Sequence, residues 1–277
     1  MCSVVNGCGI EYVDNISKFP NTDEVSTGTT ILAMHYAGGV ILAADSRTSS
    51  GQFVSNRVAR KITKLLPNIY VARCGSAADT QNLSLILKYY GQVLRQQLRI
   101  FNYEPHGSNV YVRGMDVDPS HSESNTGNYQ PNNPISTFSY SYKHDQECGF
   151  MGPTVNCIAS IAQNLVHEYK DRLRCGLIFA GVDFTGIPDV YIVMPGGAKI
   201  KVDSFISAGS GSGYIQAFLQ SNYKKDQSAE ESVRLAKQAI LYATKNDSMS
   251  GGLVRLVNID TQSVQEYCFD VNTPMLN

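Results

Sequence analysis

Residues 29–47, with the sequence TTILAMHYAGGVILAADSR, decide the fold of this 277-residue chain. Two runs of mainly apolar and β-branched residues, 30–36 and 40–44, are separated only by the tripeptide AGG. Such runs favour strands, and a short connection that contains glycine is typical of a β-hairpin. We therefore predict that the folded body begins with two antiparallel strands.

The other strand and helix patterns follow in blocks. Helical spacing of apolar residues begins after Gly75 and recurs at 155–169, after the glycine-rich run 209–213, and after a capping box that starts at Ser228. Strand patterns occupy residues 69–74, 175–182, 189–194, 205–208, 253–259 and 264–269. This order lacks the strict alternation of a doubly wound parallel sheet. It predicts an α+β fold of two antiparallel sheets covered by helices.

Charge and composition exclude several classes of partner. Lysine and arginine number 23 against 24 aspartate and glutamate residues, so the chain lacks the positive excess of a protein that tracks phosphate groups. No apolar stretch has the length of a membrane span. The seven cysteines form no C-x-x-C pair and have no matching histidine spacing. We expect separate reduced thiols, and no nucleic acid, membrane or metal ion as a partner.

Two segments differ in composition from the rest. Residues 102–149 are rich in Asn, Ser, Gly and Pro and contain no leucine, a composition that cannot build a hydrophobic core. Residues 1–28 are polar and show no periodicity. We predict a pro-segment at 1–28 and a single domain at 29–277, which carries a low-complexity loop insertion at about 102–149.

Several common catalytic motifs are incomplete. His167 and Glu168 are followed by Asp171 where a zinc-binding helix needs its second histidine. The run that starts at Gly209 has Tyr214 in the last glycine position of the dinucleotide fingerprint. The chain has neither a phosphate loop nor a G-x-S-x-G elbow. We therefore expect no cofactor.

A set of separated motifs occurs in a fixed order. The motifs are STGTTILA at 26–33, GGVILAADSR at 38–47, NRVARK at 56–61, CGSAADT at 74–80, GSGSG at 209–213 and DSMSGG at 247–252. In these residues the chain resembles the catalytic beta subunits of the 20S proteasome, from residue 27 to about 269 apart from the insertion. The resemblance implies the four-layer αββα sandwich of the N-terminal-nucleophile hydrolases and threonine endopeptidase activity.

The resemblance also implies a set of catalytic residues. A threonine hydroxyl is a weak nucleophile, and a free α-amine on the same residue can serve as its base. Gly28 lets the hydroxyl approach the carbonyl that it attacks when the pro-segment is removed by autolysis at Gly28–Thr29. Gly75 matches the glycine whose N–H forms the oxyanion hole. The implied catalytic set, in which the aspartate orients the lysine and the lysine relays the proton, is Thr29, Asp45, Lys61, Ser210, Asp247 and Ser250.

Substrate preference follows from the same resemblance. The run GSAADTQ at 75–81 is similar to the caspase-like type, called beta one. Arg73 matches the arginine at the base of its primary specificity pocket, where a guanidinium pairs with a substrate carboxylate. Cleavage after acidic residues is therefore implied; a plain surface arginine is the alternative. Ala59 stands where a polar residue is usual, which widens the pocket. The implied substrate-binding set is Arg73, Thr48, Ser49, Ala59 and Ala77.

Partners and location are implied as well. They are other beta subunits and alpha subunits in a stacked four-ring particle of 28 chains, unfolded polypeptide substrates, and regulatory caps that bind through the alpha rings, in cytoplasm and nucleus. Three alternatives stay open: a non-catalytic beta subunit of the same ring, another N-terminal-nucleophile amidohydrolase, and the two-ring bacterial relative that works with an unfoldase. The complete catalytic set argues against the first.

Overall fold

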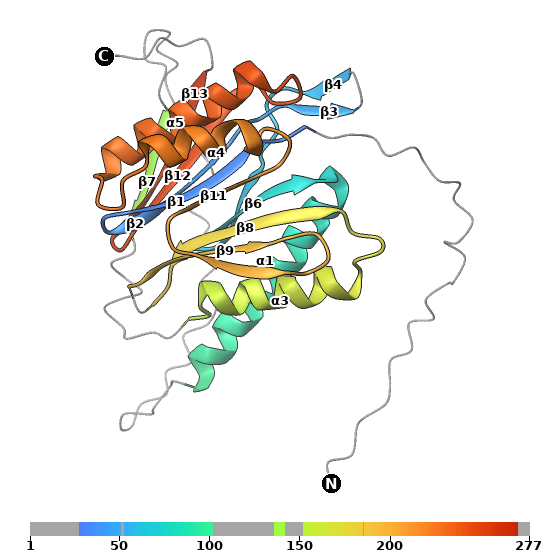
Figure 1. Ribbon diagram of the computed structural model, residues 1–277. Helices are drawn as coiled ribbons and strands as arrows, with labels where there is room; N and C mark the ends of the chain where they lie inside the picture. Colours follow the sequence, from blue (N-terminus) through green and yellow to red (C-terminus); the bar gives the residue numbers. More distant parts are fainter. Residues whose placement is uncertain (1–27, 51–52, 102–135, 142–151, 185, 271–277) are drawn as a thin grey trace, which may run out of the picture.

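The computed structural model describes residues 28–50, 53–101, 136–141, 152–184 and 186–270. Two antiparallel sheets pack face to face, and helices cover the outer face of each sheet (Figure 1). The predicted α+β sandwich with four layers is confirmed. A separate two-stranded ribbon, β3 (Thr48–Ser50) with β4 (Phe53–Asn56), follows the first hairpin.

The first sheet has six strands in the order β11-β1-β2-β12-β13-β7. Its central hairpin pairs β1 (Ile31–Tyr36) with β2 (Gly39–Ala44), in a register that places Ile31 opposite Ala44. Helices α4 (Ser212–Asn222) and α5 (Ala229–Asn246) cover its outer face. The remaining strands are β7 (Ser136–Ser141), β11 (Phe205–Ala208), β12 (Leu253–Asp260) and β13 (Ser263–Asp270).

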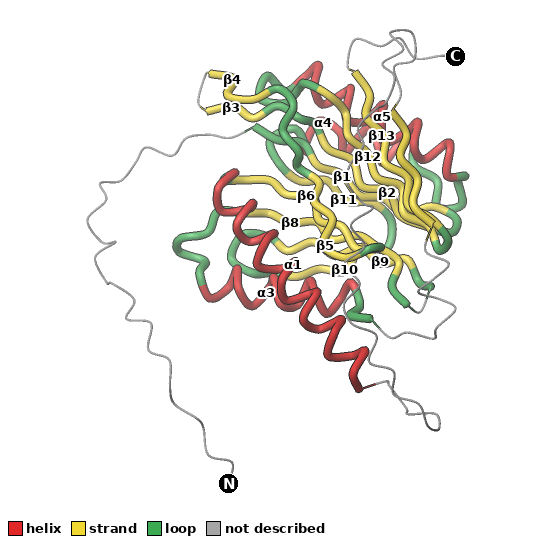
Figure 2. The backbone as a smooth tube through the Cα atoms, turned by 180° about the vertical axis from the view of Figure 1, so that it is seen from behind, coloured by secondary structure: helices red, strands yellow, loops and turns green. Residues whose placement is uncertain are grey.

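The second sheet has five strands in the order β10-β9-β8-β6-β5. Helices α1 (Ala77–Phe101) and α3 (Val155–Glu168) lie on its outer face, as Figure 2 shows from behind. The strands are β5 (Ile62–Leu66), β6 (Ile69–Gly75), β8 (Cys175–Val182), β9 (Pro188–Val193) and β10 (Lys199–Val202).

Both faces of the central hairpin are buried. Ile31 and Leu42 pack into the cluster between the two sheets, whereas Leu32 and Ile41 pack into the cluster formed with α4 and α5. Successive side chains of a strand point to opposite faces, so a strand covered on both sides needs no polar positions. This explains the uninterrupted apolar runs in residues 30–44.

Residues 136–141 correct the interpretation of segment 102–149 as a loop. They form β7, which pairs antiparallel with β13 and places Ser136 opposite Cys268. The sequence STFSYS alternates Phe138 and Tyr140 with small residues, which is a strand pattern, but the average composition of the insertion hides it. Pairing with β7 satisfies backbone groups at the edge of β13. The rest of the insertion and residues 1–27 lie outside the described residues.

The helices agree closely with the sequence pattern, and the short strands do not. The capping box of α5 is present: the Ser228 hydroxyl accepts from the N–H of Glu231, whose carboxylate accepts from the N–H of Ser228. Strands β3, β4 and β10 were not predicted. β4 is exposed throughout, and β10 has its middle residues exposed, so neither carries the apolar pattern of a core strand.

The described ranges contain no helix that combines the length and the apolar character needed to cross a membrane. They also contain no group of His, Cys, Asp and Glu side chains placed to hold a metal ion.

Candidate active site

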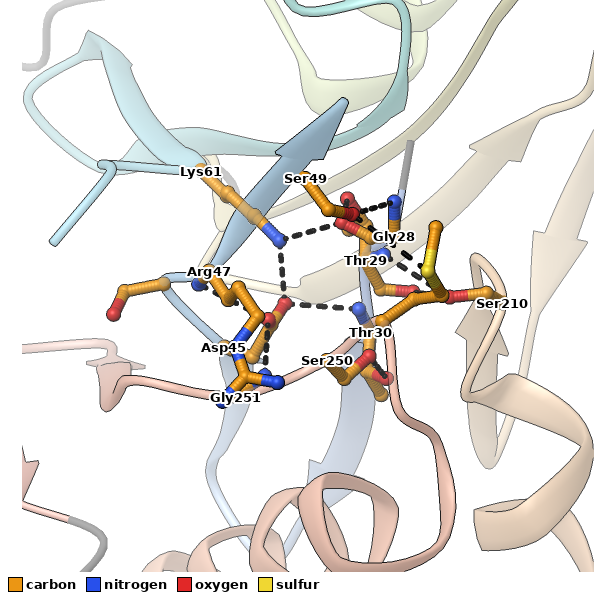
Figure 3. Close-up of polar contacts among 12 residues, drawn as sticks. Gly28, Thr29, Thr30, Asp45, Arg47, Ser49, Lys61, Ser210, Ser250 and Gly251 are labelled. Atoms are coloured by element: carbon orange, nitrogen blue, oxygen red, sulfur yellow. Dashed lines mark hydrogen bonds and ion pairs between the residues drawn. The ribbon is translucent and has the colours of Figure 1, made fainter. Parts of the chain in front are cut away.

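The six predicted catalytic residues lie at element ends that meet in one place, and Figure 3 labels five of them, all except Asp247. Thr29, Lys61 and Ser210 precede β1, β5 and α4, in that order. Asp45 follows β2, and Asp247 and Ser250 belong to the loop between α5 and β12. Five are buried, and Ser210 is exposed. Hydrogen bonds join them into one cluster, which comprises Thr29, Asp45, Lys61, Ser210, Asp247 and Ser250.

Asp45 holds the buried amine of Lys61. Lys61 Nζ lies 2.7 Å from Asp45 Oδ1, and the same oxygen accepts from the N–H of Thr30 at 2.9 Å. The other carboxylate oxygen accepts from the N–H groups of Gly251 at 3.0 Å and Arg47 at 3.2 Å. Burial lowers the pKa of Lys61, and the charge of Asp45 opposes this without cancelling it. Asp45 is therefore fully hydrogen-bonded although it is completely buried.

Gly28, the residue before Thr29, is held by three contacts. The carbonyl oxygen of Gly28 accepts from the Thr29 hydroxyl at 2.6 Å and from Lys61 Nζ at 3.2 Å. The N–H of Gly28 donates to Ser49 Oγ at 3.1 Å. A Cβ at position 28 would overlap the side chain and carbonyl of Met249, so only glycine fits. Lys61 thus contacts the carbonyl that the Thr29 hydroxyl would attack.

A second carboxylate lies on the opposite side of Thr29. The N–H of Thr29 donates to Ser210 Oγ at 3.1 Å, and Ser210 donates in turn to Asp247 Oδ2 at 2.7 Å. Ser250 donates to the same oxygen at 2.6 Å. Burial acts to raise the pKa of Asp247, but the hydrogen bonds from Ser250, Ser210 and the N–H of Met249 outweigh it and hold that pKa below its ordinary value. The nitrogen of Thr29 is therefore linked to a carboxylate through one hydroxyl.

Gly75 and Arg73 lie near this cluster at the end of β6. Gly75 has a φ of 102°, and a Cβ there would overlap the carbonyl oxygen of Arg174. The N–H of Arg73 donates to the carbonyl of Lys61 at 3.0 Å, and its guanidinium donates to the carbonyl of Arg60 at 2.6 Å. Arg73 Nε is buried and has no hydrogen-bond partner among the described residues. The side chain thus keeps a donor for a further acceptor.

The other predicted substrate-binding residues are spread over three elements. Thr48 and Ser49 lie on β3, and Ser49 is the one that contacts Gly28. Ala59 follows β4, and its N–H donates to the carbonyl of Ser46 at 2.9 Å. Ala77 is exposed at the first position of α1. Their contact with substrate stays a prediction.

Comparison with known proteins shows the family to which the chain belongs. The model of the proteasome subunit family matches residues 25–108 and 136–259. The probable proteasome subunit beta type-1 of Schizosaccharomyces pombe is 32% identical over 250 residues, which cover 90% of this chain and 88% of that protein. The chain belongs to the proteasome beta subunit family.

The relatives of this beta subunit carry more than one type number. The proteasome subunit beta type-1 of Saccharomyces cerevisiae is 32% identical over 89% of this chain and 90% of its own length. The proteasome subunit beta type-6 of Dictyostelium discoideum is 32% identical over 92% and 91%. The family match omits residues 109–135 and includes β7. Most of the insertion thus lies outside the family model.

Three residues of the site were missed by sequence reasoning, although all lie in or beside the motifs used. Thr30 donates its N–H to Asp45, and its hydroxyl lies 2.7 Å from Ser250 Oγ. The N–H of Gly251 donates to Asp45, and the guanidinium of Arg47 donates to the carbonyl of Ser248 at 3.0 Å. Their proximity to Thr29 and Asp45 in sequence was the available signal. Their contacts depend on tertiary structure.

Proposed function

We propose that this beta subunit is an active threonine endopeptidase and that Thr29 is its nucleophile. The observation that carries the proposal is the place of Thr29 between two carboxylate sets, Asp45 with Lys61 and Asp247 with Ser210. A hydroxyl nucleophile needs a base and a defined path for its proton. Buried charges cost stability unless they are paired, so a purely structural subunit would gain little from this cluster.

We infer that the first reaction is self-cleavage after Gly28. Thr29 Oγ1 bonds to the carbonyl carbon of Gly28, the peptide C–N bond breaks, and the hydroxyl proton passes to the Thr29 nitrogen. Water then hydrolyses the resulting ester, which releases residues 1–28 with a free carboxyl group and restores the Thr29 hydroxyl. The contact between Lys61 Nζ and the carbonyl oxygen of Gly28 supports this step, because a cation there stabilises the developing oxyanion.

Peptide hydrolysis then repeats this chemistry on a substrate. The free α-amine of Thr29 accepts the hydroxyl proton, directly or through Lys61, while Oγ1 bonds to the substrate carbonyl carbon. The proton passes to the leaving amine, and water hydrolyses the ester to regenerate Thr29. Hydrogen bonding of Ser210 and Ser250 to Asp247 would fix the protons around the amine, and the N–H of Gly75 would bind the oxyanion. No cofactor takes part in these steps.

The proposed substrates are unfolded polypeptides that are cleaved after acidic residues. The support is Arg73, whose buried Nε has no partner in the described part of the chain. A carboxylate beside a guanidinium gains a charge-assisted hydrogen bond, whereas a lysine side chain would bring two cations together. Hydrogen bonds to charged groups contribute about 1.5–3 kcal/mol, so we expect an acidic preference of about ten- to a hundred-fold. The small side chain of Ala59 widens the proposed specificity pocket, so we also expect slower cleavage of peptides after leucine.

Peptides that differ only at the residue before the cleavage site test this preference. The assay uses assembled particles in which the other catalytic beta subunits are blocked, and compares the native sequence with Arg73→Met. We expect glutamate and aspartate peptides to be cleaved fastest, and the preference to disappear in Arg73→Met. Equal rates on acidic and basic peptides in the unaltered subunit would refute the acidic preference.

Membership of the family implies a multi-subunit proteasome particle. We propose the stacked four-ring particle of 28 chains, with alpha rings that receive regulatory caps, and a location in cytoplasm and nucleus. The interior of such a particle is a closed compartment. It fits the proposed activity, because only unfolded chains that can enter the particle would reach Thr29.

Loss of the nucleophile tests the proposed activity itself. Thr29→Ala should abolish the peptidase activity assigned to this subunit, whereas Thr244→Ala, on α5 and outside the site, should leave it unchanged. Activity that persists in Thr29→Ala would favour the non-catalytic alternative, and failure to join a particle would favour a separate amidohydrolase.

A further inference from the structure

Thr30 lies between the two carboxylate sets that flank the nucleophile. Its N–H donates to Asp45 Oδ1 at 2.9 Å, and its hydroxyl lies 2.7 Å from Ser250 Oγ. The side chain is completely buried. Thr30 therefore contacts both the pair Asp45–Lys61 and the pair Asp247–Ser250, and Figure 3 shows its contacts with Asp45 and Ser250.

The direction of the hydrogen bond between Thr30 and Ser250 follows from the proton count. A serine hydroxyl has one proton, and that of Ser250 goes to Asp247 Oδ2 at 2.6 Å. Ser250 Oγ must then accept from Thr30, so the Thr30 hydroxyl is the donor at 2.7 Å. A chain of donors results, from Thr30 to Ser250 to Asp247.

A second chain of donors links the nucleophile to the same carboxylate oxygen. Asp247 Oδ2 accepts from both Ser250 and Ser210, and Ser210 Oγ accepts from the nitrogen of Thr29. Hydrogen bonds in series polarise one another, so the bond from Thr30 strengthens the one that Ser250 donates to Asp247. Gly211 packs closely against the Thr30 hydroxyl, because a Cβ at that position would overlap Thr30 Oγ1.

We propose that the Thr30 hydroxyl is a positioning group for the threonine protease reaction: it fixes Ser250 as a donor to Asp247 and so holds the hydrogen bonds around the Thr29 amine. This inference rests on the proposed function. Thr30 does not touch the substrate or the reacting atoms. Its β-branched side chain also packs in the core, and that packing is the competing explanation for a buried threonine at this position.

Two substitutions at Thr30 separate the effect of its hydroxyl on activity from the effect of its packing. Thr30→Val keeps the shape and removes the hydroxyl, whereas Thr30→Ser keeps the hydroxyl and removes the methyl group. We expect Thr30→Val to lower kcat about ten-fold with little change in KM, and Thr30→Ser to keep kcat within about three-fold of the unaltered subunit. The control Thr244→Val removes a hydroxyl that donates to Leu241 within α5, and should have no effect on kcat.

A double substitution tests whether Thr30 acts through Ser250. If it does, Thr30→Val should change kcat less than about two-fold when Ser250 is already alanine. The opposite order at position 30, with Thr30→Ser impaired and Thr30→Val normal, would assign Thr30 to packing and overturn the inference. If Thr30→Val particles do not assemble, a kcat for Thr30→Ser below one fifth of normal overturns it.

The controls distinguish failure of this inference from failure of the proposed function. An unaltered subunit with normal activity and a normal Thr30→Val variant would refute only the role of Thr30. An unaltered subunit without peptidase activity would refute the proposed function, and the inference with it.

Discussion

Lys61 and Asp45 form a charged pair that water barely reaches, with side-chain exposures of 8% and 0%. Removing a charge from water is costly, and the pair is tolerated because N–H groups complete the hydrogen bonding of the carboxylate. Burial lowers the pKa of Lys61, which favours the neutral amine, and Asp45 favours the charged one. The two effects on the pKa of Lys61 therefore oppose each other, and burial is the larger.

Asp45→Asn should destabilise the subunit by about 3 kcal/mol, because it leaves the buried amine without its carboxylate and lowers the pKa of Lys61 further. Denaturant unfolding measures the change. The matched control is Asp189→Asn, which breaks the 2.8 Å pair with Lys201, a lysine that is 53% exposed. There we expect less than about 1 kcal/mol. Equal losses in the two variants would contradict the importance assigned to burial.

Among the described residues, four cysteines are not paired in disulfides: Cys74, Cys157, Cys175 and Cys268. Burial raises the pKa of Cys74 and of Cys175 to about 11, from an ordinary 9.0. Alkylation requires the thiolate, so at pH 8 both should react about a hundred-fold more slowly than an ordinary thiol. Their reactivity should increase as the pH rises toward 11. Mass spectrometry after iodoacetamide treatment measures this, and rapid labelling of Cys74 in the native protein at pH 8 would contradict it.

At the scale of elements, the sequence predicted the helices and strands that carry an apolar pattern and missed strands that lack one. Helices α3, α4 and α5 follow from periodic apolar positions, since burial of one face imposes that spacing. Strand β8 follows from a continuous apolar run, which is buried throughout. Strands β4 and β10 are largely exposed, so burial leaves no pattern in them. β7 depends on the edge of β13, a partner that is far away in sequence.

The capping box of α5 offers a test at this scale. Ser228→Ala removes the acceptor for the N–H of Glu231 at the start of the helix, and should lower the free energy of unfolding by about 1 kcal/mol. Peptidase activity should be unchanged, because the site contacts the other end of α5. The control Ser221→Ala removes a hydroxyl that donates to Ala217 within α4, and should cost less. Equal stability of the two variants would argue against the capping box.

At the scale of the molecule, the sandwich brings five separated segments to one place. The antiparallel register of β1 with β2 sets Thr30 beside Asp45, and the loop after α5 adds a second carboxylate. Family motifs predicted which residues would meet. They could not predict that Lys61 contacts the carbonyl of Gly28, that Ser49 binds its N–H, or that Thr30 bridges the two sets, because such contacts depend on side-chain packing across the fold.

Assembly is the prediction for the whole molecule. As a member of the proteasome family, the native chain should sediment with other subunits in one large particle. Peptidase activity should peak in the fractions that contain the particle. Velocity sedimentation of the purified native protein measures this, and an active, stable monomer would contradict it.

The N-terminus of the assembled chain tests the central claim most directly. The particles are purified with inhibitors of other proteases. Intact-mass measurement of the unaltered particle should give a chain that begins at Thr29. In Thr29→Ala, residues 1–28 should stay attached. A chain that keeps its first 28 residues in the unaltered particle, or trimming after Gly28 in Thr29→Ala, would contradict the account of Thr29 as a self-processing nucleophile.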